Sequence, residues 1–438
     1  MRVVVAALAV ALIACLPGIA HLRVTPDGVY YAAIAQNLLA GNGYATGLDQ
    51  PAVTWMPGYP LVLTVATALF HNVADSANAV NFLAVAAIFV LSWLLLVEWR
   101  GSKDWLTWLG AAITAASPVM LSCTGSALSE PLFAAFAMLL LYAATKAEGS
   151  RRHWWLMVGA ALAVALTRHT GTLLLVAVAL MWRKRSYWLA LAPGAVAAVA
   201  WLTLAGTGAQ EPRVFSVVRG LDGLLRSFYG LAEQVGGWPM VGLLLVMAWP
   251  WRKSSDNEGR ATWASVLFML TTALSGFILT AGDMESRMQL GAFVPLMLCL
   301  VSTVLWCDDD HVRYGLTAGL AVASFIAVIG GVLDTSTMPV DFNRQTWRKS
   351  QAVAVIAQLA ESCDIYTNAQ DGVWLATGAK TYQLPRTDGK HFSKPPQDRG
   401  GLLVWFDIGR TYYVTPQHYG GRIVRQGRVG DATMMVVK

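Results

Sequence analysis

Long apolar runs recur along the first three quarters of this chain, and they constrain its fold more than any other feature. Most are long enough to cross the hydrocarbon core of a bilayer, which is about 30 Å thick. Charged residues make up 13% of the sequence, whereas about a quarter of the residues of soluble domains are charged. The sequence therefore predicts a polytopic α-helical membrane protein.

We expect about eleven spans, some of them short. They are Val3–Ala20, Ser76–Val97, Trp105–Ser122, Pro131–Lys146, Trp154–Thr167, Thr170–Trp182, Tyr187–Ala205, Trp238–Trp251, Thr262–Ala281, Met288–Trp306 and Tyr314–Leu333.

Every second loop between these runs is basic. Lys and Arg accumulate in cytoplasmic loops, so the N-terminus and the basic loops are expected in the cytoplasm, with the protein in the cytoplasmic membrane. The loops of the opposite set then lie together on the outer side. The basic loops contain Arg100 and Lys103, Lys146 to His153, Arg183 to Arg185, Arg252 to Arg260, and Arg313.

A change in composition after Leu333 predicts a second domain. Residues 1–333 form the expected membrane domain, with a first outer loop at 21–75, and residues 334–438 form a small extracytoplasmic α/β domain. Its expected elements are a helix at Trp347–Glu361, strands at Asp364–Thr367, Thr381–Leu384 and Leu402–Phe406, and a hairpin at Arg422–Val437.

Several functional classes are not supported by the sequence. The net charge of +6 lies in the short loops, without the basic stripe that nucleic acid requires. The five cysteines have neither metal-ligand spacing nor the pattern of a disulfide framework. Phosphate-binding loops, serine-hydrolase elbows, zinc-protease motifs and dinucleotide fingerprints are absent.

The first outer loop, centred on Thr25–Pro60, contains the main catalytic candidate. Asp27 lies where the chain leaves the first span, a place suited to a base that takes a proton from a hydroxyl nucleophile. The alternative is a helix cap, because Pro26-Asp27-Gly28 resembles a helix start. Further candidates for substrate or supporting contacts are Tyr30, Tyr31, Asn37, Tyr44, Asp49 and Tyr59; Asp49 also fits a turn, and the aromatic residues also fit membrane-boundary anchors.

Outer-side basic residues form a second set of candidates. Arg168 and His169 separate two short apolar runs, and Arg287 precedes another. They could neutralise an anionic lipid phosphate. The alternatives are side chains that extend to the headgroups and, for Arg287, an ion pair with Asp283 or Glu285. Glu130 fits either a helix start or a carboxylate that orients a basic residue.

These motifs resemble those of the GT-C glycosyltransferases, the superfamily that includes protein O-mannosyltransferases and the lipid A aminoarabinose transferase. The resemblance rests on Asp27-Gly-Val-Tyr-Tyr, Asn37-Leu-Leu-Ala-Gly-Asn-Gly-Tyr44 and Pro57-Gly-Tyr-Pro60, with shorter matches at Ser129-Glu-Pro131, Leu166-Thr-Arg168 and Arg287 with Pro295.

The resemblance implies a polyprenyl-phosphate sugar donor and an inverting transfer to a hydroxyl on a glycan, lipid or protein. It assigns Asp27 as base or anchor, and Arg168 and Arg287 to the lipid phosphate. Many relatives have an acidic residue directly after the Asp, where this chain has Gly28. That departure leaves metal dependence and acceptor type open. No Asp-x-Asp pair lies in an outer loop, so we expect neither a cofactor nor a required divalent metal. The alternative functions are a transporter or flippase and a non-catalytic cell-envelope assembly protein.

Overall fold

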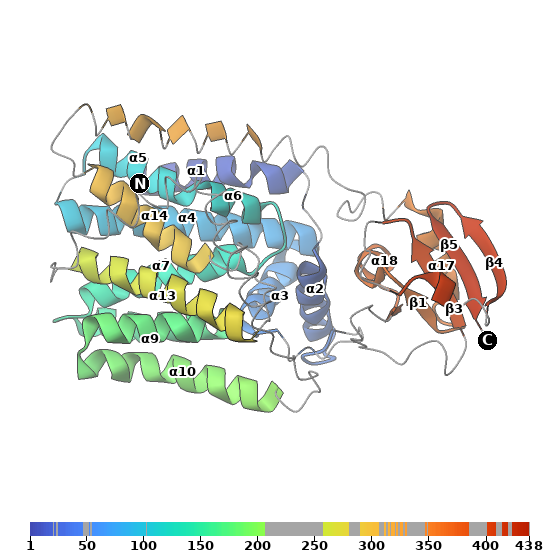
Figure 1. The fold of residues 1–438 in the computed structure, drawn as a ribbon. Coiled ribbons are helices and arrows are strands. Elements are labelled where there is room, and N and C mark those ends of the chain that lie inside the picture. The colour runs from blue at the N-terminus through green and yellow to red at the C-terminus, as the bar shows by residue number, and fades with distance from the viewer. Residues whose placement is uncertain are drawn as a thin grey trace.

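The protein is mostly helical, and a small sheet follows the helices in the chain (Figure 1). The computed structural model describes residues 1–20, 25–46, 55–101, 103–205, 257–279, 290–305, 349–384, 401–408, 414–418 and 423–437, with Leu22, Ala52, Trp347 and isolated positions between 311 and 330.

Elongated helices run side by side in a bundle (Figure 1). They are α1 (Arg2–Ala20), α4 (Val73–Arg100), α5 (Trp105–Ala115), α6 (Pro118–Thr124), α7 (Glu130–Lys146), α8 (Arg151–Thr167), α9 (Gly171–Trp182), α10 (Arg185–Ala205), α13 (Asn257–Leu279) and α14 (Leu290–Leu305). Helix α7 joins two hydrophobic cores, because Ala134 packs with α1, α4, α5 and α14, whereas Ala137 packs with α8, α9, α10 and α13.

The outer surface of the bundle is apolar. Val5 of α1 is 61% exposed, and Val196 and Leu204 of α10 are 67% and 76% exposed. Such surfaces are unfavourable in water and favourable in lipid. Three described helices have the length and hydropathy of spans, at Arg2–Ile19, Val73–Arg100 and Arg185–Leu204, and shorter apolar helices accompany them. A membrane protein is therefore confirmed, while the count of eleven spans stays a prediction.

The expected span Trp105–Ser122 is not one helix. Helix α5 ends at Ala115, and α6 begins at Pro118 after an extended Ser117 with ψ 149°. Proline lacks an amide hydrogen and disfavours helical backbone in the residue before it, so the helix stops there. The expected span Trp238–Trp251 lies outside the described residues.

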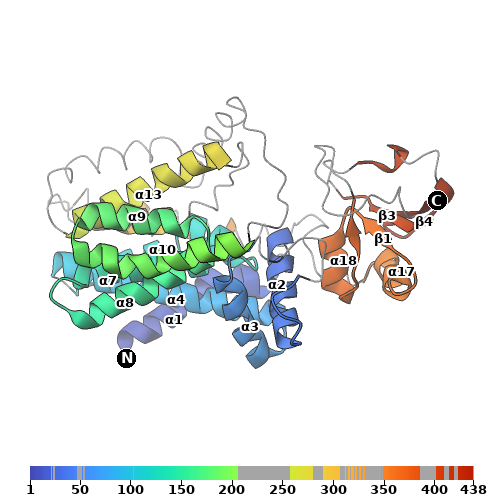
Figure 2. The ribbon, with the colours of Figure 1, turned by 90° about the horizontal axis from the view of Figure 1, so that it is seen from below.

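The first outer loop contains two helices at one end of the bundle. Helix α2 (Pro26–Leu39) lies across that end, beside α3 (Gly58–Phe70) (Figure 1). The sequence indicated the first of these but not α3, whose 13 residues are too few to span a bilayer. Both helices lie between the bundle and the C-terminal sheet, as the second view also shows (Figure 2).

The C-terminal domain has the predicted strands. They are β1 (Ile365–Thr367), β2 (Tyr382–Gln383), β3 (Gly401–Phe406), β4 (Ile423–Val429) and β5 (Ala432–Val437), in the order β2-β1-β3-β5-β4. Strand β1 is parallel to β2 and β3, and β5 is antiparallel to β3 and β4. Helix α17 (Gln351–Leu359) was expected, whereas α18 (Gln370–Thr377) was not. Helix α18 lies on the side that faces α2 (Figure 2).

Candidate active site

The start of α2 places Asp27 at the end of the bundle that faces the C-terminal domain. Thr25 is the N-cap, and its hydroxyl oxygen accepts a hydrogen bond from the Gly28 amide at 3.1 Å. The cap interpretation of Asp27 is therefore wrong, because the residue before Pro26 performs that role. Asp27 lies in the first turn and is half-buried. A carboxylate there is stabilised by the positive end of the helix dipole.

Gly28 explains why α2 can lie so close to the loop before α7. A Cβ added at Gly28 would lie 2.8 Å from the carbonyl oxygen of Ala127 and 3.2 Å from its Cβ. Both separations are tighter than ordinary van der Waals contact, so a larger side chain requires the two segments to separate. An acidic residue directly after Asp27, as the resemblance implies for many relatives, does not fit this packing.

A polar chain runs from α2 to the end of α8. The Tyr31 hydroxyl lies 3.3 Å from Ser129 Oγ, and Arg168 Nη1 donates to the same Ser129 oxygen at 3.1 Å. Arg168 Nη1 also lies 2.8 Å from Glu130 Oε1. The side chain of Glu130 is 3% exposed and that of Arg168 is 16% exposed. Two charges in so little water are stable only as a pair.

Tyr31 shares its surroundings with three charged groups. Burial raises the pKa of the Tyr31 hydroxyl well above its ordinary value. The carboxylates of Asp27 and Glu130 add to this rise in pKa, and the Arg168 guanidinium opposes it. The Tyr31 phenol therefore stays neutral at physiological pH. Tyr31 also connects Asp27, one turn earlier on α2, to Ser129 and the Arg168–Glu130 pair.

Helix ends hold Arg168 in place. Arg168 is the C-cap of α8, with extended backbone at φ −147° and ψ 146°. The start of α3 packs on the same turn, because a Cβ at Gly58 would lie 2.8 Å from the carbonyl oxygen of Leu166 and equally close to Thr167 Oγ1. This close approach of α3 to α8 brings Tyr59 beside the polar chain.

Tyr59 contributes a hydroxyl whose partner is not among the described residues. Its side chain is fully buried, and its ring meets the Tyr31 ring edge-on with centroids 4.9 Å apart. Within the part of the chain that the structure describes, the Tyr59 hydroxyl has no hydrogen-bond partner. A buried hydroxyl in that state costs about 1–3 kcal/mol.

Other candidates in the first outer loop stabilise the loop itself. Tyr30 stacks on Trp55 with centroids 4.2 Å apart, and the Tyr44 hydroxyl donates to the Trp55 carbonyl oxygen at 2.9 Å. Asn37 Nδ2 donates to the carbonyl oxygen of Ala45 at 2.8 Å. These contacts account for the three side chains without a substrate.

Three predicted site residues remain. His169 is exposed, one residue beyond Arg168. Asp49 and Arg287 lie outside the described residues. The described residues of the expected site thus converge on Asp27, Tyr31, Tyr59, Glu130 and Arg168.

Ser129 belongs to the polar chain but was not among the candidate site residues. It occupies the N-cap position of α7 and makes no side-chain cap hydrogen bond. Its hydroxyl, fully buried, contacts Tyr31, Arg168 and, at 3.4 Å, Glu130 Oε2. A serine before Glu-Pro looks the same in sequence whether it caps a helix or joins a polar cluster.

The charges of the cluster limit what it can bind alone. Asp27 and Glu130 carry one negative charge each and Arg168 carries one positive charge, so the three ionised groups sum to about −1. Glu130 pairs with Arg168 at 2.8 Å. A phosphate at this site needs Arg168 and at least one further cation.

Comparisons with known proteins give a match at the level of structure. No protein-family model matches the sequence, and no curated protein matches it. The crystal structure of ArnT from Cupriavidus metallidurans bound to undecaprenyl phosphate superposes with a TM-score of 0.61 at 14% identity, covering 99% of this chain and 97% of that chain. The apo structure of the same ArnT gives 0.60 at 14% identity with the same coverage. ArnT is a GT-C enzyme, so this chain has the GT-C fold that the sequence motifs predicted, over nearly its whole length.

Proposed function

We propose that this chain is an integral membrane glycosyltransferase. It moves a sugar from a polyprenyl-phosphate donor to a hydroxyl acceptor on the outer face of the cytoplasmic membrane. The observation that carries the proposal is the cluster of Asp27, Tyr31 and the Arg168–Glu130 pair in a chain with the ArnT fold. The undecaprenyl phosphate bound to ArnT supports the same class of lipid as donor carrier here.

The reaction is a displacement at the anomeric carbon of the donor sugar. The acceptor oxygen forms a bond to that carbon while the bond from carbon to phosphate oxygen breaks. Asp27 takes the acceptor proton, and the lipid phosphate leaves with the bonding electron pair. Attack opposite to the leaving phosphate inverts the anomeric configuration. General-base catalysis of this kind typically contributes about 10²–10⁴-fold to the rate.

Arg168 acts on the leaving phosphate, where negative charge grows in the transition state. Glu130 and Ser129 fix its guanidinium, which removes the entropic cost of ordering the side chain during the reaction. Glu130 also compensates part of the charge of Arg168. We therefore assign the rest of the phosphate neutralisation to Arg287 and His169. The carboxylates of the described cluster are occupied by these roles, and we propose a transfer that requires no metal.

The positions of the helix ends support the proposed orientation. Helix α4 begins beside α3 and ends in Arg100, and the loops with Lys146, Arg151 and Arg183 lie at the same end as the N-terminus. Basic loops favour the cytoplasm. The cluster and the C-terminal domain lie at the other end of the bundle (Figure 1). We accordingly place both outside the cytoplasm.

Transfer of a radiolabelled sugar tests the proposal. Purified protein in lipid nanodiscs is given undecaprenyl-phosphate sugars together with a mixture of membrane glycolipids and glycans as acceptors. We expect loss of label from the lipid phosphate and its appearance in an alkali-stable product. A transporter or flippase would instead move labelled lipid across sealed vesicles without cleaving the sugar–phosphate bond. Movement without cleavage would refute the proposal.

A further inference from the structure

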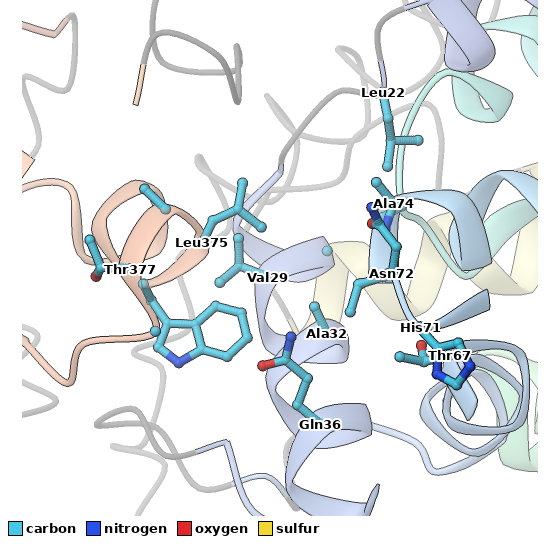
Figure 3. A pocket seen from close by; sticks show the side chains of 16 residues that line it. Leu22, Val29, Ala32, Gln36, Thr67, His71, Asn72, Ala74, Leu375 and Thr377 are labelled. Carbon is cyan, nitrogen blue, oxygen red and sulfur yellow. The ribbon is translucent and has the colours of Figure 1, made fainter. Parts of the chain in front are cut away.

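A cavity of about 390 Å³ separates the membrane domain from the C-terminal domain. Most of its lining comes from one face of α2, the turn between α3 and α4, and helix α18, and Leu22 and Ala127 complete it (Figure 3). Its volume lies within the range of about 300–1,000 Å³ that is typical of small-molecule sites. The cavity is separate from the polar cluster described above, whose side chains do not line it.

The two sites lie on different faces of α2. Gly28, Val29, Ala32 and Gln36 line the cavity. At 3.6 residues per turn their mean direction is about 135° from that of Asp27 and Tyr31. The two faces meet at the first turn, because Gly28 of the cavity directly follows Asp27. A ligand in the cavity therefore reaches the vicinity of Asp27 only at this end of the helix.

Among the described residues that line the cavity there is no aspartate, glutamate, lysine or arginine. Its hydrogen-bonding side chains include Gln36 from α2, His71 and Asn72 from the α3–α4 turn, and Thr377 from α18 (Figure 3). Alanine, valine and leucine side chains form much of the remainder, and Trp374 adds one indole. Polar groups from several elements around a mostly apolar wall are typical of a site that orients an uncharged ligand.

The polar side chains of the α3–α4 turn are held in place. His71 ends α3 in the left-handed region at φ 56°, and Asn72 caps α4 by accepting a hydrogen bond from the Ala74 amide at 2.9 Å. A non-glycine residue at positive φ is uncommon and costs energy. Both side chains are thus presented to the cavity by a fixed turn, which lowers the entropic cost of binding.

Trp374 connects the cavity to both domains. It belongs to α18, yet it packs in one hydrophobic cluster with Val29 and Ala32 of α2 and is 8% exposed. The C–H face of a pyranose packs against an aromatic ring, and its hydroxyls match amide and hydroxyl groups. A hydrocarbon chain would use the apolar wall but would not match the polar groups of Gln36 and His71, which is unfavourable.

We propose that this cavity binds an uncharged sugar residue of the acceptor, and that the acceptor of this enzyme is a neutral glycan. The inference rests on the proposed glycosyltransferase function and adds the acceptor class and its position. The C-terminal domain contributes to acceptor choice through Trp374 and Thr377 of α18. A phosphorylated or carboxylated sugar is disfavoured at this position because no described lining residue is a lysine or arginine, and His71 is the one titratable side chain among them.

Direct binding without donor lipid tests the inference separately from catalysis. Saturation-transfer NMR on protein in nanodiscs is recorded with methyl glycosides of glucose, galactose and mannose and with their 6-phosphates. We expect at least one neutral glycoside to bind, and its 6-phosphate to bind at least about tenfold more weakly. Trp374→Ala and Gln36→Ala should each weaken the neutral glycoside at least about tenfold.

Two control variants separate the outcomes. Trp405→Ala removes an indole from β3 of the same domain, outside the cavity, and should leave binding unchanged. Asp27→Asn should also keep glycoside binding, since its side chain does not line the cavity. If the unmodified protein binds the glycoside but transfers no sugar, only the catalytic proposal is contradicted. Gln36 is exposed on α2, and its truncation leaves the fold intact. Three outcomes would overturn the inference. They are equal or tighter binding of the 6-phosphates, Trp374-dependent binding of laurate instead of a glycoside, and no glycoside binding by the unmodified protein.

Discussion

Replacing Glu130 by glutamine removes one charge of a nearly buried ion pair and keeps the shape of the side chain. The perturbation leaves Arg168, 16% exposed, without its carboxylate partner 2.8 Å away. Breaking a buried ion pair costs about 3–5 kcal/mol. Arg168 retains the Ser129 hydroxyl as an acceptor and gains an amide oxygen, so we expect Glu130→Gln to lower the free energy of unfolding by about 2–3 kcal/mol.

A matched control lies at the opposite end of the bundle. Glu98 pairs with Lys146, with side chains 39% and 32% exposed. Exposed pairs are worth about 0–1 kcal/mol, so Glu98→Gln should have an effect at least about twofold smaller. Unfolding of both variants and the unmodified protein is followed by tryptophan fluorescence in mixed micelles with increasing SDS. Equal destabilisation by the two substitutions would refute the assignment of Arg168 and Glu130 as a buried pair.

A double variant separates stability from donor binding. Replacing both members of a buried pair by apolar residues of similar size is often neutral or stabilising. Glu130→Leu with Arg168→Met should therefore unfold within about 1 kcal/mol of the unmodified protein. It should nevertheless lose most of its affinity for undecaprenyl phosphate, because the guanidinium is gone. Unchanged affinity of the folded double variant would remove Arg168 from the phosphate site.

Three further substitutions and one control, Gly159→Ala, test the packing around the cluster. Gly58→Ala places a Cβ 2.8 Å from the Leu166 carbonyl oxygen, so it should lower the free energy of unfolding by about 1–3 kcal/mol. At Gly159 an added Cβ meets nothing within 4 Å, so Gly159→Ala should raise the free energy of unfolding by about 0.5–1 kcal/mol. Both are measured by SDS unfolding. Tyr59→Phe removes a buried hydroxyl without a partner among the described residues, so it should not destabilise the protein, and a fall in transfer rate would show that this hydroxyl contacts substrate. Gly28→Asp should lower thermal stability, because the side chain meets a backbone oxygen 2.8 Å from its Cβ; normal stability with added metal dependence would contradict this packing.

The architecture could be predicted because its signals are local. Apolar length indicated the membrane helices, and alternation with a turn at Gly430 indicated the β4–β5 hairpin, where Gly430 adopts φ 56°. Helix α3 was missed because its apolar run is short and no basic loop beside it marked a separate helix. The break at Pro118 was missed because apolar composition continues across it.

The candidate site could be predicted only in part, because its contacts join distant segments. The outer position of Arg168 indicated either a contact with a lipid phosphate or a side chain that extends to the headgroups. The sequence also offered Glu130 as a carboxylate that orients a basic residue, but it could not pair the two. Ser129 gave no signal beyond that of a helix cap. Trp374 joins α18 to α2, and no local pattern predicts a contact between two domains.

Sugar transfer by Asp27→Asn tests the central claim most directly. The amide keeps the size of the side chain but cannot accept a proton at neutral pH, so loss of a general base should lower the rate by about 10²–10⁴-fold. The control is Asp75→Asn, which alters an exposed carboxylate in the first turn of α4 and should leave the rate unchanged. Both are assayed with undecaprenyl-phosphate sugars after confirming that the variants unfold like the unmodified protein. Full transfer activity in folded Asp27→Asn would contradict the account.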